Sequence, residues 1–201
     1  MSGAASTTPL VALVSKEEAT PEVRELFEAG EEVYGRVLNT WHALAQRPEI
    51  FVAYMPYLRS IVGPGALDQR LKELVEVRTV VLNRCLYSTS HRVRSARAAG
   101  VSEEDVVAVA RGELSAFSER EQLALSVAEE LTLRPTTVAY AEAPQLVETA
   151  MLERLRASFT DPEIVELIAT IAIWNALARF HRVMGFELDM DAPPKAVSAE
   201  L

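Results

Sequence analysis

Helix-start signals recur along this chain, and they constrain its fold more than any other feature of the sequence. Three segments carry a capping box, in which Ser or Thr is followed three residues later by Glu: Ser15–Glu18, Ser118–Glu121 and Thr160–Glu163. Such paired side chains satisfy the free backbone N–H groups of a helix's first turn. No stretch alternates apolar and polar residues in the manner of paired strands. The sequence therefore predicts an all-α protein of about eight helices.

Glycine and proline mark where these helices stop or bend. Gly63-Pro64-Gly65 breaks the chain, Gly100 and Gly112 can end helices in the left-handed conformation, and Pro56 predicts a kink inside its helix. A second start signal stands at Thr20-Pro21. The expected helices cover about 15–37, 48–62, 68–83, 85–100, 102–112, 118–133, 144–158 and 163–184.

The same signals divide the chain into one helical domain with two loose ends. Its 201 residues suit a single domain or a pair of small fused repeats. We expect a flexible N-terminal arm over 1–14 and a helical domain over 15–188. A flexible C-terminal tail is expected over 189–201, where Pro193-Pro194 interrupts regular structure.

Charge and hydropathy restrict the partners of the chain. A formal net charge of −9 would repel nucleic acid. The first fifteen residues lack the basic start of a secretory signal, and the uncharged run Leu167–Ala178 is shorter than the ~20 residues of a membrane helix. We expect a soluble, cytoplasmic protein with no nucleic-acid or membrane partner. The apolar helix 163–184 belongs in a core or between subunits of a homo-oligomer.

Candidate chemistry concentrates between Asn83 and His91. This stretch holds the only cysteine, Cys85, and one of three histidines, and Glu73 precedes the cysteine by twelve residues. At a helix start, free N–H groups stabilise a thiolate. Ser88 and His91 follow at one-turn spacing, so acid, imidazole and thiol could form a proton relay.

A purely structural interpretation stands beside this one. A lone cysteine in an intracellular helix is usually a small buried hydrophobe, and a lone histidine is more often structural than catalytic. Metal binding is weaker still, because His42, His91 and His181 lie far apart and no Cys-x-x-Cys pair exists. We expect no metal and no cofactor.

These residues resemble the signature of the carboxymuconolactone decarboxylase superfamily, which includes alkylhydroperoxidase D-like proteins. The resemblance runs through Leu71-Lys-Glu-Leu74, Asn83-Arg-Cys-Leu-Tyr87-Ser88 and His91, and continues over roughly 15–188. It implies an all-helical fold that assembles into dimers, trimers or hexamers. It also implies that Glu73 takes the family's acid position and Cys85 that of its first cysteine.

Two positions depart from the family pattern. Ser88 stands where redox members have the second cysteine, so no internal disulfide can form. Many members place the histidine where this chain has Arg92, one residue after His91.

Three functions remain open for such a chain. The first is a decarboxylase-like or isomerase-like lyase that acts on a small organic or lactone acid through Glu73, Ser88 and His91, with Cys85 lining the pocket and Tyr87 and Arg92 as donors. The second is a single-cysteine peroxidase or thiol oxidoreductase, in which an external thiol resolves a sulfenic acid. The third is a non-enzymatic helical oligomer that binds a ligand or a partner.

Overall fold

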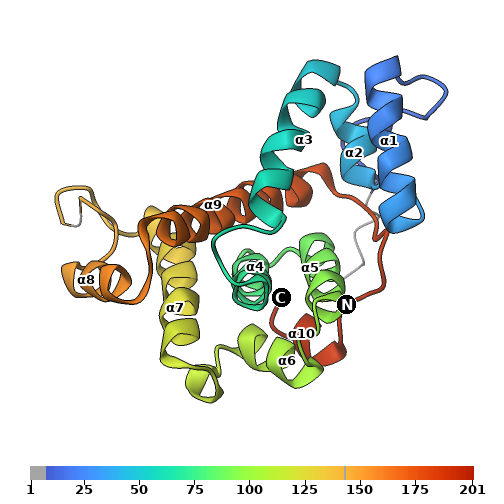
Figure 1. Ribbon diagram of the computed structural model, residues 1–201. Helices are drawn as coiled ribbons and strands as arrows, with labels where there is room; N and C mark the ends of the chain where they lie inside the picture. Colours follow the sequence, from blue (N-terminus) through green and yellow to red (C-terminus); the bar gives the residue numbers. More distant parts are fainter. Residues whose placement is uncertain (1–7, 143) are drawn as a thin grey trace.

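Helices form all the regular structure in the part of the chain that the computed structural model describes, residues 8–142 and 144–201 (Figure 1). This confirms the all-α prediction. The α-helices are α1 (Pro21–Tyr34), α2 (Asn39–Leu44), α3 (Pro48–Val62), α4 (Gln69–Leu82), α5 (Leu86–Ala98), α6 (Glu103–Arg111), α7 (Glu119–Leu133), α8 (Thr149–Ser158), α9 (Asp161–Met184) and α10 (Lys195–Ser198). Short 3₁₀ turns cover Leu114–Ala116 and Arg134–Thr136.

Helix α4 lies at the centre of the fold and packs against α5, α6, α7 and α9 (Figure 1). Because neighbours surround it, every residue from Leu71 to Val81 is buried, including its charged ones. A buried charge is tolerated only when it is paired. The charged side chains of α4 therefore connect it to its neighbours, as Arg78 does by donating to the carbonyls of Val109 and Ala110.

Helices α1, α2 and α3 form a second layer with a core of its own (Figure 1). Phe27, Trp41, Phe51 and Met55 are its largest buried side chains. This layer contacts the rest of the fold mainly through α3 and α9. Pro56 lies within α3, which continues on both sides of it.

The turn between α4 and α5 positions the chemistry-bearing stretch. Arg84 adopts a left-handed backbone conformation with φ of 52°, which few non-glycine residues do. Cys85 then becomes the N-cap of α5, and its sulfur accepts from the Ser88 N–H at 3.4 Å. The Asn83 side chain joins this turn to α9 by donating to Asn175 Oδ1 at 2.9 Å.

Both expected loose ends pack onto the fold within the described residues. Residues 1–7 of the expected arm lie outside the described part, but Leu10 N–H donates to the Met184 carbonyl and Val14 N–H to that of His42. In the tail, Asp189 is only 7% exposed and Val197, in α10, is fully buried in the main core. The tail packs against the fold because Val197 is buried in the main core and Asp189 binds the buried side chains of Tyr87 and His91. Helix α8 begins at Thr149, five residues later than expected.

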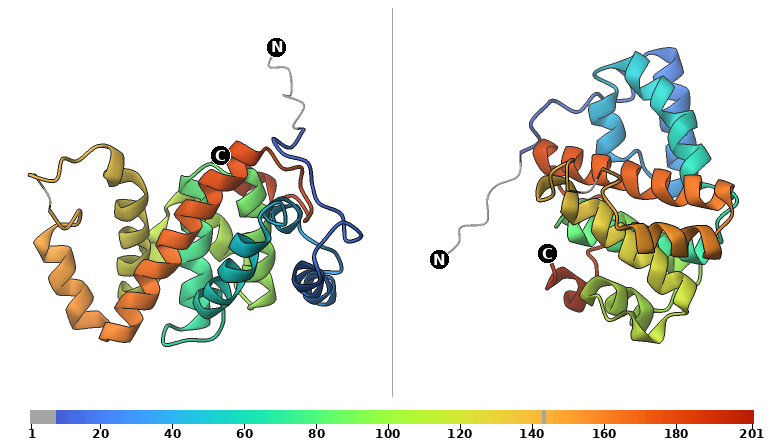
Figure 2. Two further views of the ribbon diagram at one scale, coloured as in Figure 1. Left: turned by 90° about the horizontal axis from the view of Figure 1, so that it is seen from above. Right: turned by 90° about the vertical axis from the view of Figure 1, so that its left-hand side faces the viewer.

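Helix α9 is the longest element and crosses the molecule beneath α3 (Figures 1 and 2). Among the described residues it alone is long and apolar enough to cross a membrane by length and composition, and half of its most apolar window is buried inside the protein. A core helix has the same composition. Val165 and Val183 remain largely exposed on it, and a subunit interface there stays a prediction.

Candidate functional site

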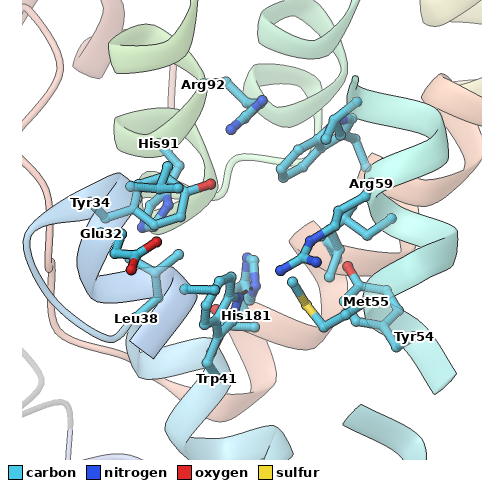
Figure 3. Close-up of a pocket in the computed structure, with 17 residues that line it drawn as sticks. Glu32, Tyr34, Leu38, Trp41, Tyr54, Met55, Arg59, His91, Arg92 and His181 are labelled. Carbon is cyan, nitrogen blue, oxygen red and sulfur yellow. Dashed lines mark hydrogen bonds between the residues drawn. The ribbon is translucent and has the colours of Figure 1, made fainter. Parts of the chain in front are cut away.

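A cavity of about 330 Å³ lies between the α1–α3 layer and helices α5 and α9. Its wall is mostly apolar and aromatic, with a few polar groups among the rings. Figure 3 shows Arg59 and Tyr54 entering from α3, opposite His91 and Tyr34, with Glu32 nearby. This is the usual composition of a small-molecule site, in which apolar walls bind and a few polar groups orient.

His91 is the imidazole that α5 presents to this cavity, and Asp189 of the tail holds it. His91 Nε2 lies 2.6 Å from Asp189 Oδ1. The other oxygen of Asp189 accepts from the Tyr87 hydroxyl at 2.6 Å and from the Asn39 N–H at 2.7 Å. Among the described residues no hydrogen bond reaches His91 Nδ1. That nitrogen is therefore available to exchange a proton with a ligand.

Cys85 is linked to a second histidine through the serine that replaces the second cysteine. Ser88 Oγ lies 3.1 Å from Cys85 Sγ and 2.8 Å from His181 Nδ1, and all three residues are buried. His181 comes from the last turns of α9 and lines the same cavity as His91. The cysteine, by contrast, does not line this cavity. It lies in the wall of a second, open cavity of about 370 Å³, which His181 and Phe186 also line.

Two hydroxyl groups continue this arrangement from His181 to the His91–Asp189 pair. Thr40 Oγ1 lies 2.9 Å from His181 Nε2 and 3.2 Å from the Tyr87 hydroxyl. The Thr40 N–H donates to the same hydroxyl at 3.3 Å. Because Thr40 follows directly after Asn39, the start of α2 binds both Tyr87 and Asp189.

Arg92 forms the charged part of the cavity wall. Its Nη1 donates to Glu76 Oε2 at 2.6 Å, and its guanidinium stacks on the Trp174 ring at 4.2 Å from the centroid. Its Nε is buried and has no hydrogen-bond partner in the part of the chain that the structure describes. An unsatisfied buried donor costs free energy, so this N–H favours an acceptor supplied by a ligand.

Glu73 lies behind Arg92 and not beside the cysteine. Its carboxylate accepts from Ser95 at 2.8 Å and from Gln69 at 3.0 Å, and the residue is 3% exposed. The expectation that Glu73 would reach the Cys85–Ser88–His91 stripe is therefore not met by any hydrogen bond among the described residues. The side of α4 that carries Glu73 faces Ser95, which lies well along α5, and not Cys85 at the start of α5.

Burial sets the charge of both histidines. Burial, with a smaller contribution from the nearby His91, lowers the pKa of His181 to about 3. Burial also lowers the pKa of His91, although its hydrogen bond to Asp189 opposes that shift. For Asp189, burial raises the pKa, but the hydrogen bond and charge of His91, with the hydrogen bonds from Tyr87 and the Asn39 N–H, together make the net shift downward. At neutral pH the site thus holds two neutral imidazoles and one carboxylate.

This charge state predicts a pH dependence of stability. The pKa of His181 is near 6.5 in the unfolded chain and about 3 in the folded protein, so between these values the unfolded chain binds more protons. Stability is therefore intact above pH 6.5 and falls as the pH drops toward 3. Replacing His181 by Gln should make the slope of unfolding free energy against pH shallower by about 1.4 kcal/mol per pH unit in this window. Urea titrations of both proteins at pH 7, 6, 5 and 4 measure it; parallel curves would contradict it.

The structure brings together some of the predicted site residues and adds others. Ser88 contacts Cys85, and His91 and Arg92 line the same cavity. The Tyr87 hydroxyl donates to Asp189, the residue that also holds His91. Three residues of the site, His181, Asp189 and Thr40, carry no sequence signal that marks them as functional. His181 stands near the end of an apolar helix whose sequence indicates only a core or interface role, and Asp189 stands in the segment expected to be a flexible tail. Among the described residues, no group of three or more His, Cys, Asp or Glu is arranged to hold a metal ion.

Comparison with known proteins agrees with this fold and with the sequence signature. The carboxymuconolactone decarboxylase family model matches residues 48–130. No curated protein matches the chain. Among solved structures, a peroxidase-related protein with an alkylhydroperoxidase core from Ralstonia eutropha JMP134 is similar at a TM-score of 0.77, with 21% identity over 94% of each chain.

Two further structures share the architecture. A peroxidase-related protein from Silicibacter sp. TM1040 is similar at a TM-score of 0.74, with 20% identity over 98% of this chain and 97% of that one. The debrominase Bmp8 is similar at a TM-score of 0.76, with 22% identity over 97% of this chain and 99% of the other. At these identities the likeness establishes the fold.

Proposed function

We propose that this chain, whose residues 48–130 match the carboxymuconolactone decarboxylase family model and whose fold is that of alkylhydroperoxidase D-like proteins, is an enzyme for acid–base chemistry on a small organic acid. One observation carries this proposal. His91, held by Asp189, lines an apolar cavity beside Arg92, and Cys85 does not line it. A neutral imidazole with one nitrogen held and the other available is an effective general base near neutral pH.

The wall residues suit an acid with an apolar ring or lactone. Arg92 offers its buried Nε to a carboxylate or an enolate oxygen, and the aromatic residues Trp41, Tyr54 and Trp174 line the same cavity. In an isomerisation, His91 takes a proton from carbon next to a carbonyl and returns it at another carbon. In a decarboxylation, the C–C electron pair stays on carbon as CO₂ leaves, and His91 passes a proton taken up from solvent to that carbon, which forms the new C–H bond. Neither reaction needs a sulfur atom.

The cysteine variant provides the direct test of this proposal. A panel of lactone acids and β-keto acids is offered to the wild-type protein and to Cys85→Ala, and product formation is followed by mass spectrometry. We expect the variant to retain turnover within about tenfold of wild type, because a group outside the cavity makes no contact in the transition state. Loss of turnover in Cys85→Ala equal to that in His91→Gln would contradict the proposal.

A second candidate function, a single-cysteine peroxidase, is favoured by the contacts of Ser88 with Cys85 and with His181. A thiolate at Cys85 could attack a hydroperoxide: an S–O bond forms, the O–O bond breaks, and the alkoxide leaves and is protonated. Two equivalents of an external thiol would then reduce the sulfenic acid, giving water and a disulfide of that thiol. The peroxidase-related proteins of similar fold support including this reaction. A variant of the debrominase Bmp8, which has a similar fold, has been solved with 2,3,4-tribromopyrrole, so bromopyrroles are added to the panel.

Trapping of the sulfenic acid tests this second candidate. After exposure to an organic hydroperoxide, dimedone should label Cys85, the only cysteine, and peroxide consumption should require an added thiol. A Cys85 that takes up neither dimedone nor oxygen would rule this chemistry out.

A further inference from the structure

We propose that the α3 side of the cavity, through Tyr54 and Arg59, binds the carboxylate of the substrate and thereby selects organic acids. The carbonyl group next to the reacting carbon then lies on the opposite side, at Arg92 and His91. This inference rests on the proposed function and deepens it, because it assigns each end of the acid to one wall of the cavity.

Tyr54 is a buried tyrosine whose hydroxyl the protein itself does not use. Its oxygen is buried and has no hydrogen-bond partner among the described residues. Such a group costs free energy, so it usually serves a purpose other than packing. Tyr54 lines the cavity and points into it from α3 (Figure 3). A molecule bound in the cavity is therefore the natural partner for this hydroxyl.

The Tyr54 hydroxyl keeps its proton at neutral pH. Burial raises the pKa of Tyr54, and the charge of Arg92 only partly opposes that rise. The phenol is therefore available as a hydrogen-bond donor. Hydrogen bonds to ionised groups are about twice as strong as those between neutral groups. The hydroxyl thus favours the carboxylate of an acid over its other groups.

Arg59 adds a positive charge from the same helix. Its side chain enters the cavity from an exposed position on α3 (Figure 3), and it forms no hydrogen bond or ion pair within the part of the chain that the structure describes. A cation without an anionic partner attracts a free anion, although water and salt weaken the attraction at an exposed site. Tyr54 is therefore the buried part of the carboxylate site, and Arg59 is its exposed part.

The opposite wall is less suited to a carboxylate. Arg92 is already paired with Glu76 through the 2.6 Å hydrogen bond of its Nη1, and Glu73 adds a second negative charge behind it. Glu32 of α1 places another carboxylate on the His91 side (Figure 3). These groups repel an anion, whereas the buried Nε–H of Arg92 can still donate to a carbonyl oxygen. The charges therefore orient a keto acid or lactone acid with its carboxylate toward α3.

In this orientation the bound carboxylate does not react. His91 takes a proton from the carbon next to the carbonyl, the C–H electron pair forms a C=C bond, and the carbonyl oxygen becomes an enolate oxygen. Arg92 Nε donates to that oxygen, and the proton returns from His91 to another carbon. A decarboxylation in the same orientation requires a second carboxylate, attached to the reacting carbon.

Binding of two probes tests this orientation. 3-Acetylbenzoate carries a carboxylate and a ketone on one ring, and acetophenone is the same molecule without the carboxylate. By titration calorimetry, Tyr54→Phe should weaken the binding of 3-acetylbenzoate about tenfold or more, the effect of losing one hydrogen bond to a charged group, and leave that of acetophenone unchanged. Arg59→Gln should weaken only 3-acetylbenzoate, and added salt should reduce that difference.

A matched variant and a stability measurement control for a structural effect. Tyr57→Phe makes the same change on α3, at a side chain that is 54% exposed and does not line the cavity, so both affinities should stay unchanged. Tyr54→Phe removes a hydroxyl that has no partner, so its urea midpoint should equal or exceed that of wild type. A lower midpoint would show that the hydroxyl is already bonded within the protein and would overturn the proposal.

Two binding results would overturn it as well. One is a wild-type protein that binds 3-acetylbenzoate no more tightly than acetophenone. The other is a Tyr54→Phe variant that keeps its affinity for the acid or loses as much affinity for acetophenone, since the latter would place the carbonyl at α3. Because these measurements involve no turnover, they can succeed or fail independently of the assays that test the proposed function.

Discussion

Replacing Glu166 by Ala should lower the free energy of unfolding by about 3–5 kcal/mol, the range found when one member of a buried ion pair is removed. Its partner, Lys72, is fully buried in α4 and also donates to the carbonyls of Ile61 at 3.0 Å and Gly63 at 2.6 Å. The other oxygen of Glu166 accepts from the N–H groups of Ala66 and Leu67. Without the carboxylate, an ammonium ion and two amides lose their charged partner together.

The pKa of Glu166 is consistent with this role. Burial alone would raise it, but the hydrogen bond from Lys72 and those from the backbone amides hold the pKa below its ordinary value. The ionised carboxylate of Glu166 thus stabilises the fold fully at any pH above its pKa in the unfolded chain. This stabilisation is lost as the pH falls through its lower pKa in the folded protein.

Urea unfolding at pH 7 measures the effect against a matched surface pair. Glu103→Ala removes an ion pair with Arg97 in which both side chains are largely exposed, and should cost at most about 1 kcal/mol. The double variant Lys72→Met, Glu166→Gln should recover much of the loss, because the amide oxygen still accepts from the loop and no unpaired charge remains. Equal costs for Glu166→Ala and Glu103→Ala would show that the buried pair is dispensable.

Replacing His91 by Gln should reduce kcat by about 10²–10⁴-fold on any substrate that the wild-type protein converts, the usual contribution of a general acid–base group. Gln retains a side-chain N–H that can donate to Asp189, so the fold and the cavity wall should persist. It cannot accept and release a proton near neutral pH. The loss should therefore appear in kcat, with KM changed little.

Two further variants locate the proton transfer. Asp189→Asn keeps the contact but weakens the hold on His91, so an intermediate loss is expected. Glu73→Gln should cost less than His91→Gln, because Glu73 lies behind Arg92 instead of in the cavity. A loss in Glu73→Gln as large as that in His91→Gln would move the proton transfer to the Glu73–Arg92 side of the cavity.

The fold could be predicted from the sequence because its signals are local. A capping box acts within one turn, and those at Ser118 and Thr160 are formed as expected, just before α7 and α9. Gly112 and Gly185 end helices in the left-handed conformation. Start and stop positions of these helices depend on neighbours a few residues away, which the sequence displays directly.

The site could be predicted only where its members are close in the chain. Cys85, Ser88 and His91 belong to one helix, and the family signature marks them. His181 and Asp189 reach the same place from about a hundred residues away. A histidine near a helix end and an aspartate after it carry no local mark of function. Their roles follow from tertiary packing of α9 and the tail, which no pattern of spacing contains.

Asp189, which binds His91, Tyr87 and the start of α2, is synthesised after almost all of the residues that it contacts or supports. Helices α1 to α9 precede this residue in the chain and hold nearly all of the apolar core. On the ribosome, a nascent chain can therefore collapse into much of its native packing while His91 still lacks its carboxylate. His91 gains the hydrogen bond from its imidazole to Asp189 only after α9 and the segment that follows it have been synthesised and have packed onto the fold.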